Sequence, residues 1–310
     1  MTDLERYRRT DRAQDVGFVF GALTAASLPG PGLLRLLGRL HMTESAARST
    51  LAKMVRMGRL DVERHGRVGV YSLGAPLARR YRQIEGTATL PAWSGDFHGI
   101  VHQVPESARW FRDRLTYYAD FHGFGTLRPG VLISVRAEAD TVLGQLGEAP
   151  EGAVLHRVLI TPGSVEEARG MAGATWDLAE VARRAEDLTS RIRELRGSVE
   201  LEHRPGAEGR EGCEGREFRR DDPSADEARL WDVFGRWNAL YQQVMRVVLA
   251  DPHLPVELLP PRWPVGAMFD ELDRLNARWG PTLQPFLRAQ VEQAAPGLAR
   301  YEPAPWERSR

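Results

Sequence analysis

The sequence predicts an α+β protein built from several domains, and three patterns along its 310 residues support this prediction. Short apolar helices come first and lead into an alternating, hairpin-like segment. Strand-like and helix-like segments then alternate up to residue 162, and the chain after residue 175 is mainly helical. Because this length exceeds the commonest size of a single domain, we predict three domains, over residues 15–85, 93–170 and 175–298.

The first predicted domain contains three short helices. After a polar start over residues 1–14, which we expect to be loosely ordered, the apolar residues 16–27 predict a buried helix. The segment LPGPG ends that helix and starts a second one over residues 33–40, because Pro and Gly break helices and Pro is tolerated in a first turn. Thr43 is a suitable N-cap for a third helix over residues 44–57.

A hairpin follows these helices. Residues 59–74 alternate in polarity, with Gly66 placed at the turn. Three short helices followed by a two-stranded hairpin is the order found in a winged helix-turn-helix domain, so we predict that fold for this part of the chain.

The middle of the chain predicts the order strand, helix, strand, strand, helix, strand, after a linker over residues 86–92. This βαββαβ order is typical of the ferredoxin-like fold. The expected strands cover residues 97–104, 124–127, 130–135 and 153–160, and the expected helices cover residues 105–121 and 137–147.

The last predicted domain is helical. Residues 176–195 carry apolar side chains three and four positions apart, which predicts an amphipathic helix. Residues 225–251 predict a long helix, and repeated prolines over residues 251–263 end it before one or two further helices. Between the two predicted helices, the charged and Gly-rich residues 203–223 predict a flexible insertion.

Charge is unevenly distributed along the chain. Residues 1–85 contain fifteen Arg or Lys and eight Asp or Glu, although the formal net charge of the whole chain is zero. A basic N-terminal module suggests an anionic partner, either nucleic acid or a membrane surface. No apolar run reaches membrane-spanning length and no signal-peptide core is present, so we expect a cytoplasmic protein without a membrane partner.

The third helix is the strongest candidate for contact with double-stranded DNA. On a helical wheel, Ala47, Leu51, Met54 and Val55 face inward, while short polar and cationic residues face outward. An α-helix fits the major groove, and an Arg there can form a bidentate pair with guanine. The predicted DNA-contacting residues are Ser45, Arg48, Ser49, Lys53 and Arg56 from the helix, and Arg64, His65 and Arg67 from the hairpin.

Six stretches of the chain stand out together. They are TESAARSTLAKMVRMGRL, ERHGRVGVYSLG, FHGIVHQVPESARWFRDRL, GFGTLRPGVLISV, WDLAEVARRAEDL and DPHLPVELLPPRWP. In this order they resemble the PaaX family of bacterial transcriptional repressors. The resemblance implies a winged-helix domain, a ferredoxin-like domain and a helical C-terminal domain in a homodimer. It also implies a repressor that leaves its operator on binding an aryl-CoA or related acyl-CoA thioester. By position, the implied recognition helix is 44–57 and the implied wing is 61–74. The segment SAARST and the insertion over residues 203–223 depart from the family's pattern.

A CoA thioester needs cations for its phosphates and an apolar slot for its acyl group. Arginines and aromatic residues of the second and third predicted domains could supply both. The candidates are Arg109, Trp110, Arg112, Arg128, Trp237, Tyr241 and Arg262.

Two other classes of function stay open at the level of sequence. One is a metal-dependent nuclease built on the central domain, and the other is a scaffold whose basic module binds protein. His98 and His102 share one face of a predicted strand, and Asp96 and His122 could lie near them. Histidines in strands usually pack or face solvent, so we predict no metal, no cofactor and no catalytic residues. The prediction we favour is a ligand-responsive regulator that is not an enzyme.

Overall fold

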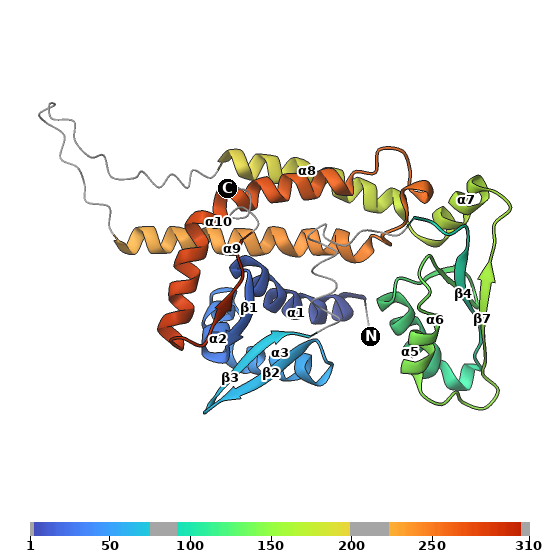
Figure 1. Cartoon of the computed structure of the whole chain (residues 1–310), viewed down its shortest axis with the longest axis horizontal. Coiled ribbons are helices and arrows are strands. Elements are labelled where there is room, and N and C mark those ends of the chain that lie inside the picture. Colours follow the sequence, from blue (N-terminus) through green and yellow to red (C-terminus); the bar gives the residue numbers. More distant parts are fainter. Residues whose placement is uncertain (1–2, 75–91, 199–222, 305–310) are drawn as a thin grey trace, which may run out of the picture. The chain divides into compact units, whose positions relative to one another are not determined.

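The computed structural model describes residues 3–74, 92–198 and 223–304, which form helices and two four-stranded antiparallel sheets (Figure 1). The predicted α+β class is therefore confirmed. Two compact units make up the structure: the first combines Met1–Thr87 with Asp187–Arg246 and Ala267–Arg310, and the second combines Ala88–Glu186 with Val247–Gly266. The three predicted domain limits stay a prediction. The predicted insertion lies outside the described residues except for Pro223, and the predicted linker does so except for Ala92.

The first unit begins with the predicted succession of helices and a hairpin. Its elements are α1 (Asp3–Leu23), β1 (Ala25–Pro29), α2 (Gly30–Arg39), α3 (Glu44–Arg56), β2 (Leu60–His65) and β3 (Val68–Leu73). The first helix begins at Asp3, and the expectation that residues 1–14 are loosely ordered stays a prediction. The predicted helix over residues 16–27 was wrong at its end, because α1 ends at Leu23 and a strand follows.

Strand β1 owes its conformation to partners that are distant in sequence. It pairs with β3 on one side and with β8 (Arg300–Tyr301) on the other, which gives the sheet order β2-β3-β1-β8. Backbone pairing across the sheet therefore overrides the local helical preference of the alanines in this segment. Nothing in the local sequence pattern indicated these pairings.

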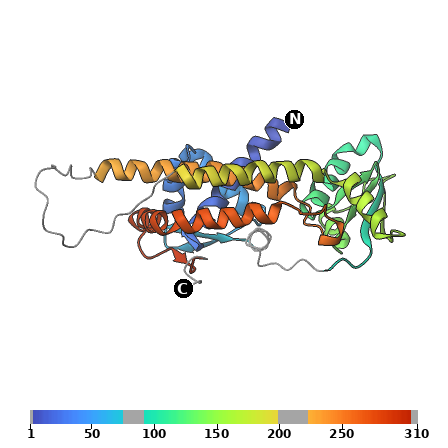
Figure 2. The ribbon, with the colours of Figure 1, turned by 90° about the horizontal axis from the view of Figure 1, so that it is seen from above.

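The first unit also contains the larger part of three long helices. Parts of α8 (Leu178–Ser198), α9 (Pro223–Ala250) and α10 (Val265–Ala294) run side by side (Figures 1 and 2). Helix α10 is a single element that contains Pro281 and Pro285, and it changes direction part-way along (Figure 1). Proline removes a backbone hydrogen bond from a helix, which is the usual cause of such a bend.

The N-terminal elements pack directly on these helices. The ring of Phe18 in α1 lies 5.4 Å from that of Phe234 and 5.5 Å from that of Trp237, both in α9. Helix α2 approaches α10 so closely that a Cβ on Gly32 would lie 2.8 Å from Cγ1 of Val291. The first unit therefore has one joint core formed from both ends of the chain.

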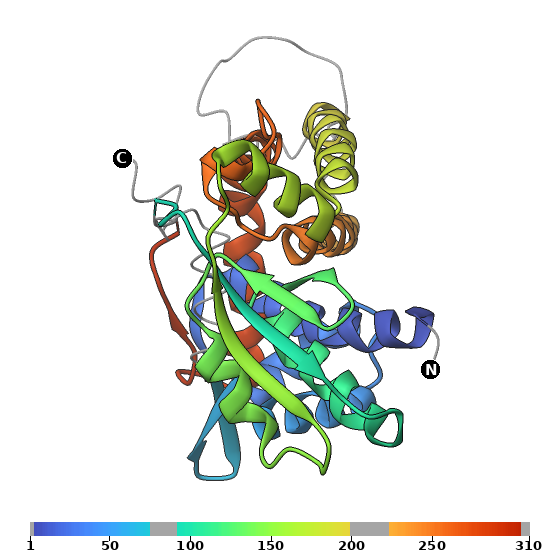
Figure 3. The same cartoon turned by 90° about the vertical axis from the view of Figure 1, so that its right-hand side faces the viewer.

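The second unit contains the other sheet, which has the order β5-β6-β4-β7 (Figure 3). Its strands are β4 (Phe97–Gln103), β5 (Gly125–Arg128), β6 (Val131–Ser134) and β7 (Val154–Ile160), with α5 (Arg109–Phe121) and α6 (Ala139–Leu146) between them. The predicted order of strands and helices is thus present. Phe111, Leu115 and Val142 from the two helices pack with Ile100 on one face of the sheet.

The opposite face of this sheet carries elements that the sequence pattern did not indicate. Helix α7 (Val165–Thr175) places Ala168 and Ala172 against Phe97 and Ile133 of the sheet. The proline-rich segment after α9, which contains the short 3-10 helix η2 (Val256–Leu258), adds Leu254 and Leu258 to the same core. Ser164 caps α7 by accepting a hydrogen bond from the backbone N–H of Glu167.

Candidate nucleic-acid interface

Helix α3 separates its buried and exposed faces as the sequence predicted. The hydroxyl of Thr43 accepts a hydrogen bond from the backbone N–H of Ala46 at 3.3 Å, so the predicted N-cap is present. Ala47, Leu51 and Met54 are buried. Val55, which was expected to face inward, is only partly buried because it lies nearer the outer face of the helix.

The residues predicted to contact DNA lie on the outer surface of helix α3 and of the β2–β3 hairpin. All of them are exposed: Ser45, Arg48, Ser49, Lys53 and Arg56 on α3, and Arg64, His65 and Arg67 on the hairpin. A helix with exposed cations and hydroxyls therefore stands next to a hairpin whose tip also carries cations. Their exposure is what contact with a polyanion requires.

The hairpin is held to the end of α3 by close backbone contacts. Strands β2 and β3 pair from Leu60 opposite Leu73 to His65 opposite Val68, and Gly66 at the turn has φ of 62°. At the base, the N–H of Gly74 donates to the carbonyl of Arg59 at 2.9 Å, and a Cβ on Gly74 would lie 2.3 Å from the carbonyl oxygen of Gly58. Only glycine fits there, so the base of the hairpin has a fixed position relative to α3.

The connection between α2 and α3 is also tightly defined. His41 has φ of 62°, a left-handed conformation that glycine normally supplies at the end of a helix. The N–H of His41 donates to the carbonyl of Gly38, and the N–H of Met42 donates to the carbonyl of Leu37 at 3.1 Å. These bonds satisfy the last carbonyls of α2 and redirect the chain into α3.

Helix α2 supports α3 from behind and is itself anchored to α10. Nη2 of Arg35 donates to Oε1 of Gln290 at 2.5 Å and to Oε1 of Gln293 at 3.2 Å. Leu33, Leu36 and Leu37 of α2 are fully buried. The exposed face of α3 is thus held in position, through α2, by the long helix α10 of the first unit.

Arg48 already has an acceptor within its own helix. Its Nε and Nη2 donate to Oε1 of Glu44 at 3.0 and 2.6 Å, and the two side chains are 65% and 67% exposed. Exposed pairs of this spacing contribute little stability, so Arg48 can exchange Glu44 for another acceptor at low cost. Nε2 of His65 lies 3.6 Å from the carboxylate of Glu63 in a similarly exposed pair.

The seven residues predicted to bind an effector are divided between the two units. In the first unit, Trp237 is buried and donates its Nε1–H to Asn276, while the ring of Tyr241 packs on Phe18. Trp237 therefore belongs to the core, and the partly buried Tyr241 packs against Phe18 of that core. In the second unit, Arg109, Trp110 and Arg128 are exposed, Arg112 pairs with Glu106 at 3.2 Å, and Arg262 lines a pocket.

Two of the four residues considered for a metal site, His122 and Asp96, have other partners. Nδ1 of His122 lies 2.5 Å from Oε2 of Glu138, and Oδ1 of Asp96 accepts a hydrogen bond from the hydroxyl of Thr161 at 2.6 Å. Burial, together with the nearby charge of Arg112, lowers the pKa of His102. Across residues 3–74, 92–198 and 223–304, no three His, Cys, Asp or Glu side chains are grouped to hold a metal. The alternative of a metal-dependent nuclease therefore has no support in this part of the chain.

Comparison with known proteins gives one informative similarity. No family model matches the chain. The transcriptional repressor PaaX of Escherichia coli (strain K12) is 27% identical over 239 residues, which cover 74% of this chain and 67% of that protein.

Among solved structures, the uncharacterized protein Rv0674 from Mycobacterium tuberculosis resembles the chain with a TM-score of 0.42 and 21% identity. That similarity covers 85% of this chain and 89% of the other. Within the described residues, no helix is long and apolar enough to cross a membrane.

The second unit contains one pocket that no sequence pattern predicted. A pocket there is lined by residues of α7 and of the proline-rich segment, including Arg169, Trp176 and Trp263. The available signal was the unusual density of proline and apolar residues over residues 251–264. Because α7 was not predicted, its contribution opposite that segment was not expected.

Proposed function

We propose that this chain is a ligand-responsive, DNA-binding transcriptional repressor whose first unit contains a winged helix-turn-helix. The main observation in support is that exposed cations of α3 and of the β2–β3 hairpin belong to one module whose apolar residues face inward. The similarity to the Escherichia coli repressor PaaX supports the same function. Helix α3 is the recognition helix in this proposal, and the hairpin is the wing.

The roles of the side chains follow from the geometry of B-DNA. The first turns of α3 enter the major groove, where Arg48 pairs with a guanine while Ser45 and Ser49 allow close approach of the backbone. Lys53 and Arg56 contact phosphates, which position the protein without reading sequence. Arg64, His65 and Arg67 reach the neighbouring backbone or minor groove.

The second unit serves regulation in this proposal. Its sheet order β5-β6-β4-β7 and the intervening helices are those expected of a ferredoxin-like fold, which is used here as a sensing unit. The effector is an aryl-CoA or related acyl-CoA thioester, as the family resemblance implies. The effector contacts proposed from the sequence include Arg109, Trp110, Arg112, Arg128 and Arg262 of this unit.

The repressor acts as a homodimer with two conformational states. Operator binding favours the state in which the two recognition helices are about 34–36 Å apart, one turn of DNA, or a multiple of that distance. The effector favours the other state, and its difference in affinity between the two states determines how far operator affinity falls.

The direct test is binding of the full chain to duplex DNA from upstream of its own gene, over a series of salt concentrations. Affinity should fall steeply with salt because phosphate contacts release counterions. Arg48→Ala, Lys53→Ala and Arg56→Ala combined should abolish binding. A matched variant with the same change of net charge should bind normally; it combines Arg157→Ala, Arg183→Ala and Arg184→Ala, at exposed residues of the second unit.

Two outcomes would contradict the proposal. If the full chain has no affinity for duplex DNA in dilute buffer, the basic module binds something else. Cleavage of the DNA on addition of Mg²⁺ or Mn²⁺ would favour the nuclease alternative, since a repressor leaves its operator intact.

A further inference from the structure

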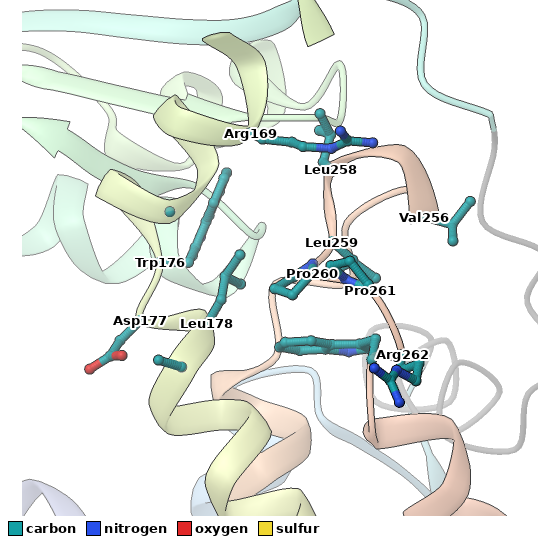
Figure 4. A pocket seen from close by; sticks show the side chains of 13 residues that line it. Arg169, Trp176, Asp177, Leu178, Val256, Leu258, Leu259, Pro260, Pro261 and Arg262 are labelled. Atoms are coloured by element: carbon teal, nitrogen blue, oxygen red, sulfur yellow. The ribbon is translucent and has the colours of Figure 1, made fainter. Parts of the chain in front are cut away.

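A pocket of about 550 Å³ lies wholly within residues of the second unit. One wall is the end of α7 and the start of α8, and the other is the segment from Val256 to Trp263 (Figure 4). Pockets of roughly 300–1,000 Å³ are those that hold small organic molecules in proteins. The volume is therefore sufficient for a ligand of several tens of atoms.

The lining of the pocket is mainly apolar and aromatic. Trp176 and Leu178 form one wall, and Leu258, Pro260 and Pro261 form the other (Figure 4). Such flat, rigid surfaces suit the faces of an aromatic ring, and they lose little conformational entropy when a ligand binds. We therefore expect these two walls to contact the apolar part of a ligand.

Two guanidinium groups supply the charge of the pocket. Arg169 comes from α7 and Arg262 from the proline-rich segment (Figure 4). Asp177 is the one acidic residue among the lining residues, and its Oδ1 accepts a hydrogen bond from the N–H of Glu180 at 3.1 Å, at the start of α8. Its carboxylate points away from the two arginines in Figure 4, so the charge offered to a ligand is positive.

The backbone around the pocket has defined features at Arg262 and binds the side chain of Arg169. Arg262 has φ of 59°, a strained conformation for a residue with a side chain, and strain of this kind concentrates at functional sites. Nε of Arg169 donates to the carbonyl of Glu257 at 2.7 Å, a bond that does not use its two terminal nitrogens. Near the start of the segment, Oδ1 of Asp251 accepts from the N–H of His253 at 2.9 Å. The wall is therefore formed before any ligand arrives.

We infer that this pocket binds a small organic anion with a flat aromatic body, in which the anionic group is a carboxylate or a phosphate. The aromatic body lies between Trp176 and the prolines, and the anionic group accepts charge-assisted hydrogen bonds from Arg262, while Arg169, at the other end of the pocket in Figure 4, adds positive charge. This inference concerns the second unit and does not require DNA binding. Only the further step, that such a ligand acts as the effector, rests on the proposed function.

The test is calorimetric titration of the full chain with three probes that share one ring system: 1-naphthoate, 1-naphthyl phosphate and the neutral 1-naphthamide. We expect saturable binding of one or both anions, with the amide at least about tenfold weaker, because it lacks the negative charge that a guanidinium recognises. The better of the two anions identifies the preferred group. If neither anion binds, or if the amide binds as well as both, the inference is wrong.

Two glycines of α7 give a matched pair of variants that locate the site. Gly173 lines the pocket and Gly170 does not, and a Cβ on either would meet no atom within 4 Å. Gly173→Trp should fill the pocket and abolish binding, whereas Gly170→Trp should leave affinity unchanged. Equal binding by both variants would place the ligand elsewhere. Melting temperatures of the two variants verify that both are folded.

The role of charge is tested separately. Arg262→Gln should weaken binding of the anions about tenfold, the typical effect of losing one charge-assisted hydrogen bond, and should leave the weak binding of the amide unchanged. Arg157→Gln, at an exposed residue of the same unit that pairs with Asp140, is the control. DNA binding is measured separately, without any probe. A chain that does not bind DNA would contradict the proposed function but would not affect the inference about the pocket.

Discussion

At the scale of single residues, base recognition in the proposed interface depends on Arg48. Its present acceptor, Glu44, is exposed and lies one turn away on the same helix. Replacing Arg48 by Ala should reduce the difference in binding free energy between operator and a scrambled duplex by about 1–3 kcal/mol, since a bidentate contact to guanine is lost. Competition binding with the two duplexes measures this difference.

The variant Glu44→Gln is the informative control for Arg48. It removes the carboxylate that now holds the guanidinium, and it also removes a negative charge from a surface proposed to face phosphates. Operator affinity should rise. A fall in affinity would mean that Glu44 orients Arg48 for recognition and does not compete with DNA for it.

Arg67 should behave differently from Arg48, because the tip of the hairpin is proposed to contact phosphate and not bases. Arg67→Ala should weaken binding to all duplexes by a similar factor and reduce the slope of log affinity against log salt by about 1. Salt titrations with operator and scrambled duplexes test both points. Loss of affinity for the operator alone would assign Arg67 a role in reading sequence.

His41 carries a local conformational cost that can be measured without DNA. Its φ of 62° is strained for a residue with a side chain, and the side chain is exposed, so no packing depends on it. His41→Gly should therefore raise the free energy of unfolding by about 1 kcal/mol. Urea unfolding of the two proteins gives the difference, and a destabilised variant would imply that the imidazole makes a favourable contact.

Among the predicted site residues, the exposure of those on α3 was easier to predict than the surroundings of the effector candidates, for a physical reason. The exposed face of α3 follows from the period of a single helix, which the positions of Ala47, Leu51 and Met54 already define. The effector candidates required knowledge of which distant segments meet. Trp237 was chosen for its chemistry, yet its ring is buried against Phe18 from the other end of the chain.

At the scale of elements, the sequence predicted those helices and strands whose stability is encoded locally. Helix α3 has its own cap and apolar stripe, and the hairpin has its own turn glycine. By contrast, β1 is a strand only because β3 and β8 pair with it, and helix α7 has few apolar residues beyond alanine to mark its buried face. Local sequence patterns predict helices and strands least well where tertiary contacts stabilise them.

The junction of α8 with α10 in the first unit contains a buried carboxylate surrounded by arginines. Oε1 of Glu271 accepts hydrogen bonds from Arg193 at 3.0 Å and from Arg274 at 2.6 Å, and Oε2 lies 3.4 Å from Arg196. The hydrogen bond from Arg193, together with the charges of the three arginines, lowers the pKa of Glu271 below its ordinary value of 4.5, although burial opposes this shift.

A pKa that is lower in the folded state gives a definite sign to the dependence on pH. The carboxylate of Glu271 stabilises the fold at pH values above 4.5 and loses this effect as the pH falls through its folded pKa. Glu271→Gln should thus be less stable than the wild type at neutral pH, with the difference shrinking in acid. Chemical unfolding of both proteins at neutral and acidic pH tests this, and a difference independent of pH would contradict it.

At the scale of the whole molecule, the C-terminal segment of the first unit completes the N-terminal module. Strand β8 pairs with β1, and the backbone N–H of Glu302 donates to the carbonyl of Thr24 at 2.8 Å. Nη2 of Arg288 in α10 donates to the carbonyl of Leu23 and to the hydroxyl of Thr24, while its guanidinium stacks on Tyr301. A change in the position of α10 would therefore be transmitted to the start of the module that carries α3.

The same joint core predicts how the N-terminal module behaves when it is separated from the rest. Residues 1–85 alone would expose the ring of Phe18 and the face of α2 around Gly32, which pack on α9 and α10 in the full chain. This fragment should unfold at a lower urea concentration than the full chain, because burial of each of the larger side chains contributes about 1.5–3 kcal/mol to stability. It should also bind a hydrophobic dye, because those side chains are then exposed. Circular dichroism and dye fluorescence of both proteins measure this. A fragment as stable as the full chain would instead favour an independent domain over residues 15–85, and the contacts with α9 and α10 would then contribute little to holding α3 in place.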